Sequence, residues 1–168
     1  ISNFHLDATK GHAGFFYKID FGNGTAIKDL TLSDITATVG NYYVGALAYF
    51  SFAVQDNITI RNFTVTTTAS EAKIGGYAGW VEWGLIRNCP IENMVVNAEK
   101  GAGLIGGLAA VLKADNWLQY NNIDVKGFKV TIHDTDNTYA EVGGLVGQTQ
   151  TGHDAPVFTN CDITGIDV

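Results

Sequence analysis

The stretch Ile60-Arg61-Asn62-Phe63-Thr64-Val65 follows the pattern Ile-x-Asn/Asp-φ-x-φ, in which φ is an apolar residue and x is variable. Related copies begin at residues 1, 27, 86, 120 and 158. The six starting points are 26, 33, 26, 34 and 38 residues apart. Such spacings are typical of supersecondary repeats that bury an apolar face only against their neighbours. The sequence therefore predicts a repeat protein built from stacked, similar units.

A glycine-rich block follows each of the first five copies, as in Ile74-Gly75-Gly76-Tyr77-Ala78-Gly79. Apolar and polar residues alternate around these blocks, which indicates strands, and the units are too short to place a helix between strands. We therefore expect an all-β parallel β-helix of about five to six irregular coils, with equivalent positions stacked about 4.8 Å apart. One such domain spans residues 1–168. Because the chain opens on one repeat and closes within another, we expect it to be a segment of a longer protein whose neighbouring repeats cover its ends.

The Asn/Asp position of the motif predicts a column of side chains along the solenoid. A side-chain amide at a bend can bond its own backbone and the equivalent residue in the next coil, so the predicted role is structural. The expected members are Asn3, Asp29, Asn62, Asn88, Asn122 and Asn160.

Composition narrows the possible partners. The 168 residues are 46% hydrophobic and 16% charged, which suits a folded core, and the net charge is −7. This negative charge disfavours nucleic acid and anionic membrane surfaces as partners. No run approaches the roughly 20 apolar residues that span a bilayer, so we expect no membrane insertion.

Cysteine and histidine provide no pattern for a metal or cofactor. Cys89 and Cys161 occupy the same motif position two coils apart, roughly 9 to 10 Å, which exceeds the ~7 Å Cα limit for a disulfide. We expect both to be buried and reduced. Their spacing matches no zinc motif, and the oxygen-rich segment 133–141 lacks the EF-hand pattern, so it is interpreted as an exposed loop.

Two surface features are candidate binding sites. Lys28, Arg61 and Arg87 each follow the first residue of a motif copy, which predicts a short basic column over successive coils. An acidic glycan or a partner carboxylate could bind there, and neighbouring acids are the simpler way to relieve the repulsion between stacked cations.

The second candidate is aromatic. Large rings follow the glycine blocks of consecutive coils, which predicts an aromatic edge that could stack on sugars or contact a protein. The alternative is that the rings pack beneath irregular insertions at residues 53–59 and 113–119. The candidate residues are Tyr49, Phe52, Trp80, Trp83 and Trp117, with Phe50 beside them.

The block Gly144-Leu145-Val146-Gly147 and the later Phe158–Gly165 segment resemble the GLUG repeat of bacterial surface and secreted proteins. The resemblance covers nearly the whole chain, although Gly107-Leu108-Ala109-Ala110 lacks the last glycine and Ala46-Leu47-Ala48-Tyr49 lacks both. It implies a non-catalytic, adhesin-like stalk or ligand-display segment at the cell surface, with a glycan or a surface protein as partner. The alternatives are a glycan-active lyase or hydrolase of the β-helix type and an accessory domain of a surface peptidase. Acidic residues seldom fall on adjacent coils in the expected columns, so we predict a protein without catalytic residues, metal or cofactor.

Overall fold

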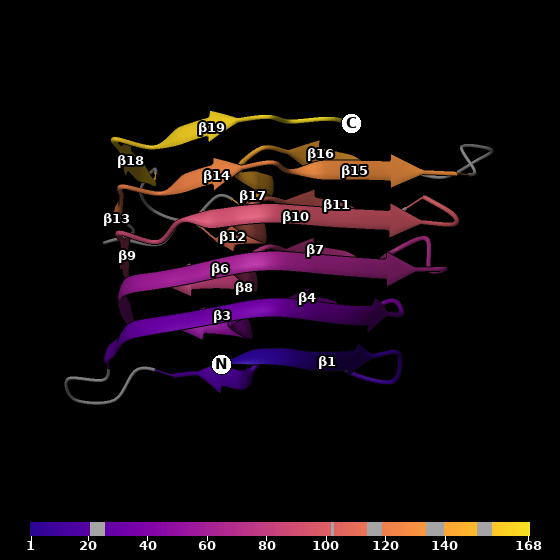
Figure 1. Cartoon of the computed structure of the whole chain (residues 1–168), viewed down its shortest axis with the longest axis horizontal. Helices are drawn as coiled ribbons and strands as arrows, with labels where there is room; N and C mark the ends of the chain where they lie inside the picture. The colour runs from indigo at the N-terminus through magenta and orange to yellow at the C-terminus, as the bar shows by residue number, and fades with distance from the viewer. Residues whose placement is uncertain (21–25, 102, 114–118, 134–139, 151–155) are drawn as a thin grey trace.

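The computed structural model describes residues 1–20, 26–101, 103–113, 119–133, 140–150 and 156–168. These residues form three sheets in which neighbouring strands run parallel, and they contain no helix. The chain winds into flattened turns that stack along one axis, with the two termini at opposite ends of the stack (Figure 1). This architecture confirms the predicted all-β parallel β-helix.

The front of each turn belongs to a ten-stranded sheet, called here the front sheet (Figure 1). Alternation of apolar and polar residues directs one set of side chains into the core. In β6, for example, Ile60 and Phe63 are fully buried, whereas Arg61 and Asn62 are exposed. The strands of the front sheet are β1 (Ser2–Ala8), β3 (Ala26–Val39), β6 (Val54–Thr67), β9 (Leu85–Arg87), β10 (Ile91–Ala98), β13 (Gln119–Asn121), β14 (Asp124–Lys126), β15 (Lys129–Ile132), β18 (Val157–Thr159) and β19 (Asp162–Thr164).

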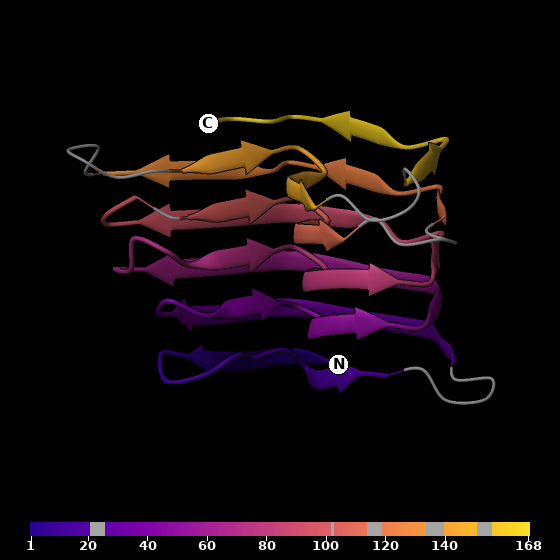
Figure 2. The same cartoon turned by 180° about the vertical axis from the view of Figure 1, so that it is seen from behind.

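Two smaller sheets form the back of the solenoid (Figure 2). The first back sheet contains β4 (Tyr43–Gly45), β7 (Lys73–Gly75), β11 (Leu104–Gly106) and β16 (Glu141–Gly143). The second back sheet contains β2 (Phe16–Ile19), β5 (Ala48–Phe52), β8 (Ala78–Trp83), β12 (Ala109–Lys113) and β17 (Val146–Gln150). From the second turn onward, each glycine block ends a strand of the first back sheet and leads into a strand of the second.

Glycine is required where the chain passes between the back sheets. A Cβ atom added at Gly75 would overlap the carbonyl oxygen of Ala78, and one added at Gly106 would overlap that of Ala109. These glycines are therefore sites of close backbone approach.

The Asn/Asp residues form two columns, which corrects the single column predicted from the sequence. Asn62 donates from Nδ2 to Asp34 at 2.9 Å and accepts from Asn93 at 3.1 Å. Asn88 instead accepts from Nδ2 of Asn122 at 2.9 Å, so Asn62 and Asn88 do not stack on each other. The first asparagine column is Asp29, Asn57, Asn88, Asn122 and Asn160, and the second is Asn3, Asp34, Asn62 and Asn93, followed by Gly127 and Gly165.

Every member of both columns has a positive φ, between 52° and 66°. Asn, Asp and Gly tolerate this left-handed conformation better than other residues, which explains why the two columns admit almost nothing else. From the second turn onward, each turn of the front sheet is thus bent twice, at two left-handed residues five positions apart, such as Asn57 and Asn62.

The sequence pattern failed to separate the columns because the motif occurs twice within one turn. In β6 an earlier copy, Gln55–Ile60, precedes the copy at Ile60–Val65, but Gln55 replaces its first apolar residue. The two asparagine columns consequently appeared as one irregular series. Measured along a column, equivalent residues are 28, 31 and 34 positions apart.

The core lies between the front sheet and the back sheets. Its side chains form interior columns such as Leu32, Ile60, Ile91 and Val125, all of which are at most 1% exposed. At both ends of the stack the interior columns reach the surface, where they leave Ile1 61% and Val168 73% exposed. This exposure follows from the geometry, because a terminal turn has a neighbour on one side only.

The two cysteines are free and share one column, separated by Ile123, as the sequence predicted. Cys89 is buried, and burial raises the pKa of its thiol to about 11. Cys161 is only half-buried, which corrects the expectation that both are buried, because it lies in the last turn.

Candidate functional site: an aromatic face on the back sheets

Nine aromatic rings from three successive turns form one connected network over the back sheets. We call it the aromatic face. The smallest centroid separation is 4.5 Å, between Tyr17 and Tyr49, and the largest is 6.5 Å, between Phe50 and Trp80. Its members are His12, Tyr17, Tyr42, Tyr43, Tyr49, Phe50, Phe52, Trp80 and Trp83.

Strand register positions the larger rings. Phe50 of β5 pairs with Trp80 of β8, and Phe52 pairs with Trp83 because the register shifts after Ser51. Ser51 and Val81, which lie between these rings, point into the core and are fully buried. The Phe52 and Trp83 rings stack at 5.3 Å with an interplanar angle of 28°. The shift therefore brings Trp83 against Phe52.

His12 joins the tyrosines at the other side of the aromatic face. Its ring stacks on Tyr49 at 4.7 Å and touches the rings of Tyr42 and Tyr43. The backbone N–H of Tyr43 donates to Nδ1 of His12 at 3.0 Å, so Nδ1 must be unprotonated while this bond exists. Burial lowers the pKa of His12, and the nearby Lys73 cation lowers it further. The geometry thus favours a neutral imidazole.

Charged side chains around the aromatic face lie close to opposite charges or over ring faces. Lys18 lies over the Phe50 ring at 5.2 Å and pairs with Asp20 at 2.7 Å. Lys113 pairs with Glu82 of β8. Lys73 lies over the Tyr43 ring at 5.5 Å. Burial also raises the pKa of the Tyr43 phenol, which keeps it neutral. The rings are therefore bordered by polar groups without a large field of one sign.

The structure brings together four of the five predicted aromatic candidates, Tyr49, Phe52, Trp80 and Trp83, and Phe50 lies with them. Trp117 lies outside the described residues. Exposure varies across the face, because Tyr17 is 62% exposed whereas the Trp80 and Trp83 side chains are half-buried.

Sequence reasoning missed His12, Tyr17, Tyr42 and Tyr43. Tyr42 and Tyr43 directly precede a glycine block, so tracing strand alternation on both sides of each block would have found them. His12 and Tyr17 flank the first block, and their place in the aromatic face depends on contact with Tyr49 of the next turn.

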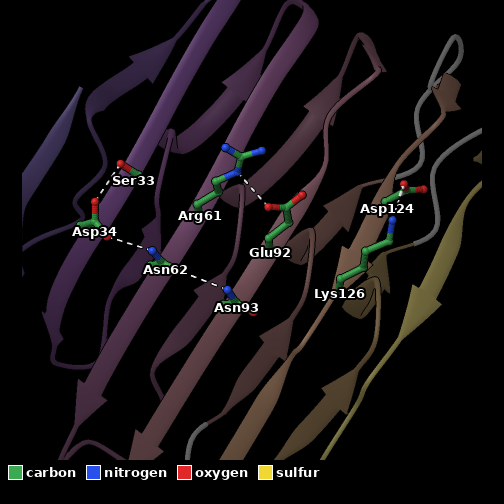
Figure 3. A network of polar contacts seen from close by, with 8 residues as sticks. All are labelled: Ser33, Asp34, Arg61, Asn62, Glu92, Asn93, Asp124 and Lys126. Atoms are coloured by element: carbon green, nitrogen blue, oxygen red, sulfur yellow. Dashed lines mark hydrogen bonds and ion pairs between the residues drawn. The ribbon is translucent and has the colours of Figure 1, made fainter.

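The predicted basic column of Lys28, Arg61 and Arg87 is wrong, because these residues belong to two columns that each include an acid. Asp56 lies between Lys28 and Arg87, and Arg87 Nη2 is 2.8 Å from Asp56 Oδ2. In the other column Arg61 is followed by Glu92, and Arg61 Nε is 2.8 Å from Glu92 Oε2 (Figure 3).

Cations and acids continue to alternate along the column toward the C-terminus. Lys126 follows Glu92 in its column and pairs with Asp124 at 3.2 Å (Figure 3). Asp124 and Asp162 are in register on neighbouring turns, and a glycan-active site would need such a pair of acids. A cation therefore lies directly beside the first of these two acids.

The described residues contain no group of three histidine, cysteine or acidic side chains that could hold a metal ion. The described residues also contain no helix with the length and hydropathy needed to cross a bilayer. Comparisons of the chain with protein-family models, curated proteins and solved structures gave no match.

Proposed function

We propose that this chain is a non-catalytic β-solenoid segment of an extracellular bacterial surface protein, and that its aromatic face binds a glycan or a surface protein. The observation that carries the proposal is the connected network of nine rings on the outer side of the back sheets. The resemblance to GLUG repeats supports the cell-surface location and the adhesin-like role.

Leaving so many aromatic rings exposed to water at a surface is unfavourable in free energy. Aromatic rings supply large contact areas with few rotatable bonds, so they contribute strongly to binding once a partner removes them from water. Tyr17, at 62% exposure, has the most ring surface left to bury. Polar groups of Lys18 and Glu82 border the rings and are placed to orient a ligand.

Repetition suits this role better than catalysis. A solenoid places equivalent side chains on successive turns, which extends a contact surface one turn at a time. A binding face can grow in this way, whereas an active site needs a unique arrangement of groups around one reacting atom.

The test uses the 168-residue chain on a glycan array and on immobilised bacterial and host surface proteins. We expect binding to at least one class, and at least a tenfold loss of affinity for Tyr17→Ala and for Trp83→Ala, because truncating a Tyr or Trp hot spot typically costs about 2 kcal/mol or more. Thr64→Ala, on the outer side of the front sheet, is the matched control and should bind normally. Binding that both ring substitutions leave unchanged would contradict the proposal.

A further inference from the structure

A groove of about 370 Å³ lies at the end of the front sheet, where its strands pass into the turns that lead to the first back sheet. It is lined by residues of four successive turns, from Thr9 in the first to Glu99 in the fourth. None of its lining residues belongs to the aromatic face. The volume falls in the range of small-ligand pockets, roughly 300 to 1,000 Å³.

One wall of the groove is an outward-facing column of the front sheet. Thr38, Thr66 and Asn97 are in register on β3, β6 and β10, so their side chains succeed one another along the solenoid axis. At about 4.8 Å per turn, this wall presents polar groups at a regular interval. The groove therefore runs across the strands and suits an elongated ligand.

The floor is fixed by buried side chains. Val39 and Thr67 are each only 2% exposed. The Thr67 hydroxyl donates to the carbonyl oxygen of Val39 at 2.8 Å and accepts from the N–H of Ala69 at 3.0 Å. These bonds hold two neighbouring turns together, so the groove has a preformed base.

Some lining groups are already engaged within the protein. The Thr9 hydroxyl donates to Asp7 at 2.6 Å, and the Thr66 hydroxyl donates to the carbonyl oxygen of Ala37 at 3.4 Å. In contrast, the side chains of Thr68, Asn97 and Glu99 form no hydrogen bond or ion pair with the described residues. The amide of Asn97, the carboxylate of Glu99 and the hydroxyl of Thr68 are thus available to bind a ligand in the groove.

We propose that this groove is a second binding site, separate from the aromatic face, and that it takes a short neutral oligosaccharide lying along the solenoid axis. Sugar hydroxyls both donate and accept, so they match an amide and a carboxylate equally well. Threonine methyl groups supply apolar contacts to the carbon-bound hydrogens of the sugar ring.

The lining disfavours other ligand classes. Among the described residues that line the groove, Glu99 alone is charged, so an anionic ligand would meet a carboxylate and no cation from them. A calcium site requires six to eight oxygen ligands, usually with several carboxylates, and the groove supplies one carboxylate. A purely apolar ligand would leave the amide of Asn97 and the carboxylate of Glu99 without partners.

The experiment is a ¹⁵N–¹H NMR titration of the whole chain with cellotetraose, chitotetraose, maltotetraose and mannotetraose, compared with sialyllactose and with Ca²⁺. We expect at least one neutral oligosaccharide to shift the resonances of Thr38, Thr68, Asn97 and Glu99. Asn97→Ala and Glu99→Ala should each weaken that binding about tenfold, which is typical of losing a hydrogen bond to a well-placed polar group. Thr68→Trp, which fills the groove from an exposed position, should abolish it.

Matched controls separate this site from the aromatic face. Asn121→Ala and Glu71→Ala make the same chemical changes outside the groove and should leave binding unaltered. Trp83→Ala should also leave it unaltered, so loss of one site is distinguishable from loss of the other. The proposal is overturned if no neutral oligosaccharide shifts the groove resonances, if only sialyllactose or Ca²⁺ does so, or if the Asn97 and Thr68 variants bind normally.

Discussion

Asn62 donates a hydrogen bond from Nδ2 to Oδ1 of Asp34 in the preceding turn at 2.9 Å, and both residues have a left-handed backbone. These two residues show both structural roles of the asparagine columns. The backbone of each residue bends the front sheet, and its side chain ties the bend to the next turn (Figure 3). The amide of Asn62 extends the chain of bonds by accepting from Asn93.

Asn62→Ala should therefore destabilise the fold more than Asn62→Gly. Both variants lose the side-chain hydrogen bonds within the column, which contribute about 1 kcal/mol. Only the alanine variant is further destabilised, by about 1–2 kcal/mol, because a left-handed backbone is unfavourable for alanine. We expect a loss of about 2 to 3 kcal/mol for alanine and about 1 kcal/mol for glycine in urea unfolding. Equal losses would show that backbone conformation contributes nothing at this position.

Gly106→Ala should destabilise the protein by about 3 kcal/mol, at the upper end of the usual range for overpacking, because the new Cβ would overlap the carbonyl oxygen of Ala109. Gly11→Ala is the matched control, since no atom lies within 4 Å of a Cβ added at Gly11. Its effect should stay within about 0.5 kcal/mol. Thermal and urea unfolding of the two variants measure the difference, and a tolerated Gly106→Ala would contradict the close approach of the back sheets.

Asp56 should contribute to stability above about pH 4 and lose that contribution in acid. Hydrogen bonds from Arg87 and Asn88 lower the pKa of its carboxyl below the ordinary value of 3.8. The unfolded chain consequently takes up the proton first as the pH falls, so the stabilisation is lost as the pH drops through the folded-state pKa. The loss of unfolding free energy between pH 7 and pH 3 should be smaller in Asp56→Asn than in the parent chain. Asp162→Asn, which removes an exposed acid in the last turn, should leave that loss closer to the parent value.

His12 should titrate below its ordinary pKa of 6.5, mainly because it is partly buried and secondarily because Lys73 is near. Since the unfolded chain is protonated first, the stability that His12 supplies is complete above pH 6.5 and declines as the pH falls below it. An NMR titration of the imidazole protons gives the value directly, and Lys73→Ala should move it upward. A midpoint at or above 6.5 would contradict the bond from the N–H of Tyr43 to Nδ1.

Cys89 should resist alkylation in the folded protein, because its thiol is buried and its pKa is raised to about 11. A Cys161→Ser variant isolates this thiol. Iodoacetamide at pH 8 should leave the folded variant unlabelled over hours and label it completely in urea. Rapid labelling without denaturant would mean that the core around Cys89 opens readily.

The fold was predictable because its main determinants are local. Strand alternation in segments such as Ile58–Val65 selects a half-buried strand, and the glycine blocks mark the link between back sheets. The aromatic candidates Phe52 and Trp83 were also found from sequence, since each follows a glycine block in its own turn. His12 was missed because its place depends on Tyr49, which lies one turn away.

The sequence by itself determined that the chain forms strands, that Asn, Asp and Gly bend them, and that the turns stack in parallel, because alternation and backbone preference act within a few residues. Only the tertiary structure decided which repeat lies on which. The register of the front sheet depends on the length of the whole turn, including the back sheets, so Asn62 lies on Asp34 and Asn93 rather than beside Asn88. The same register places an acid beside Arg61 and Arg87 and turns an expected basic column into two neutralised ones.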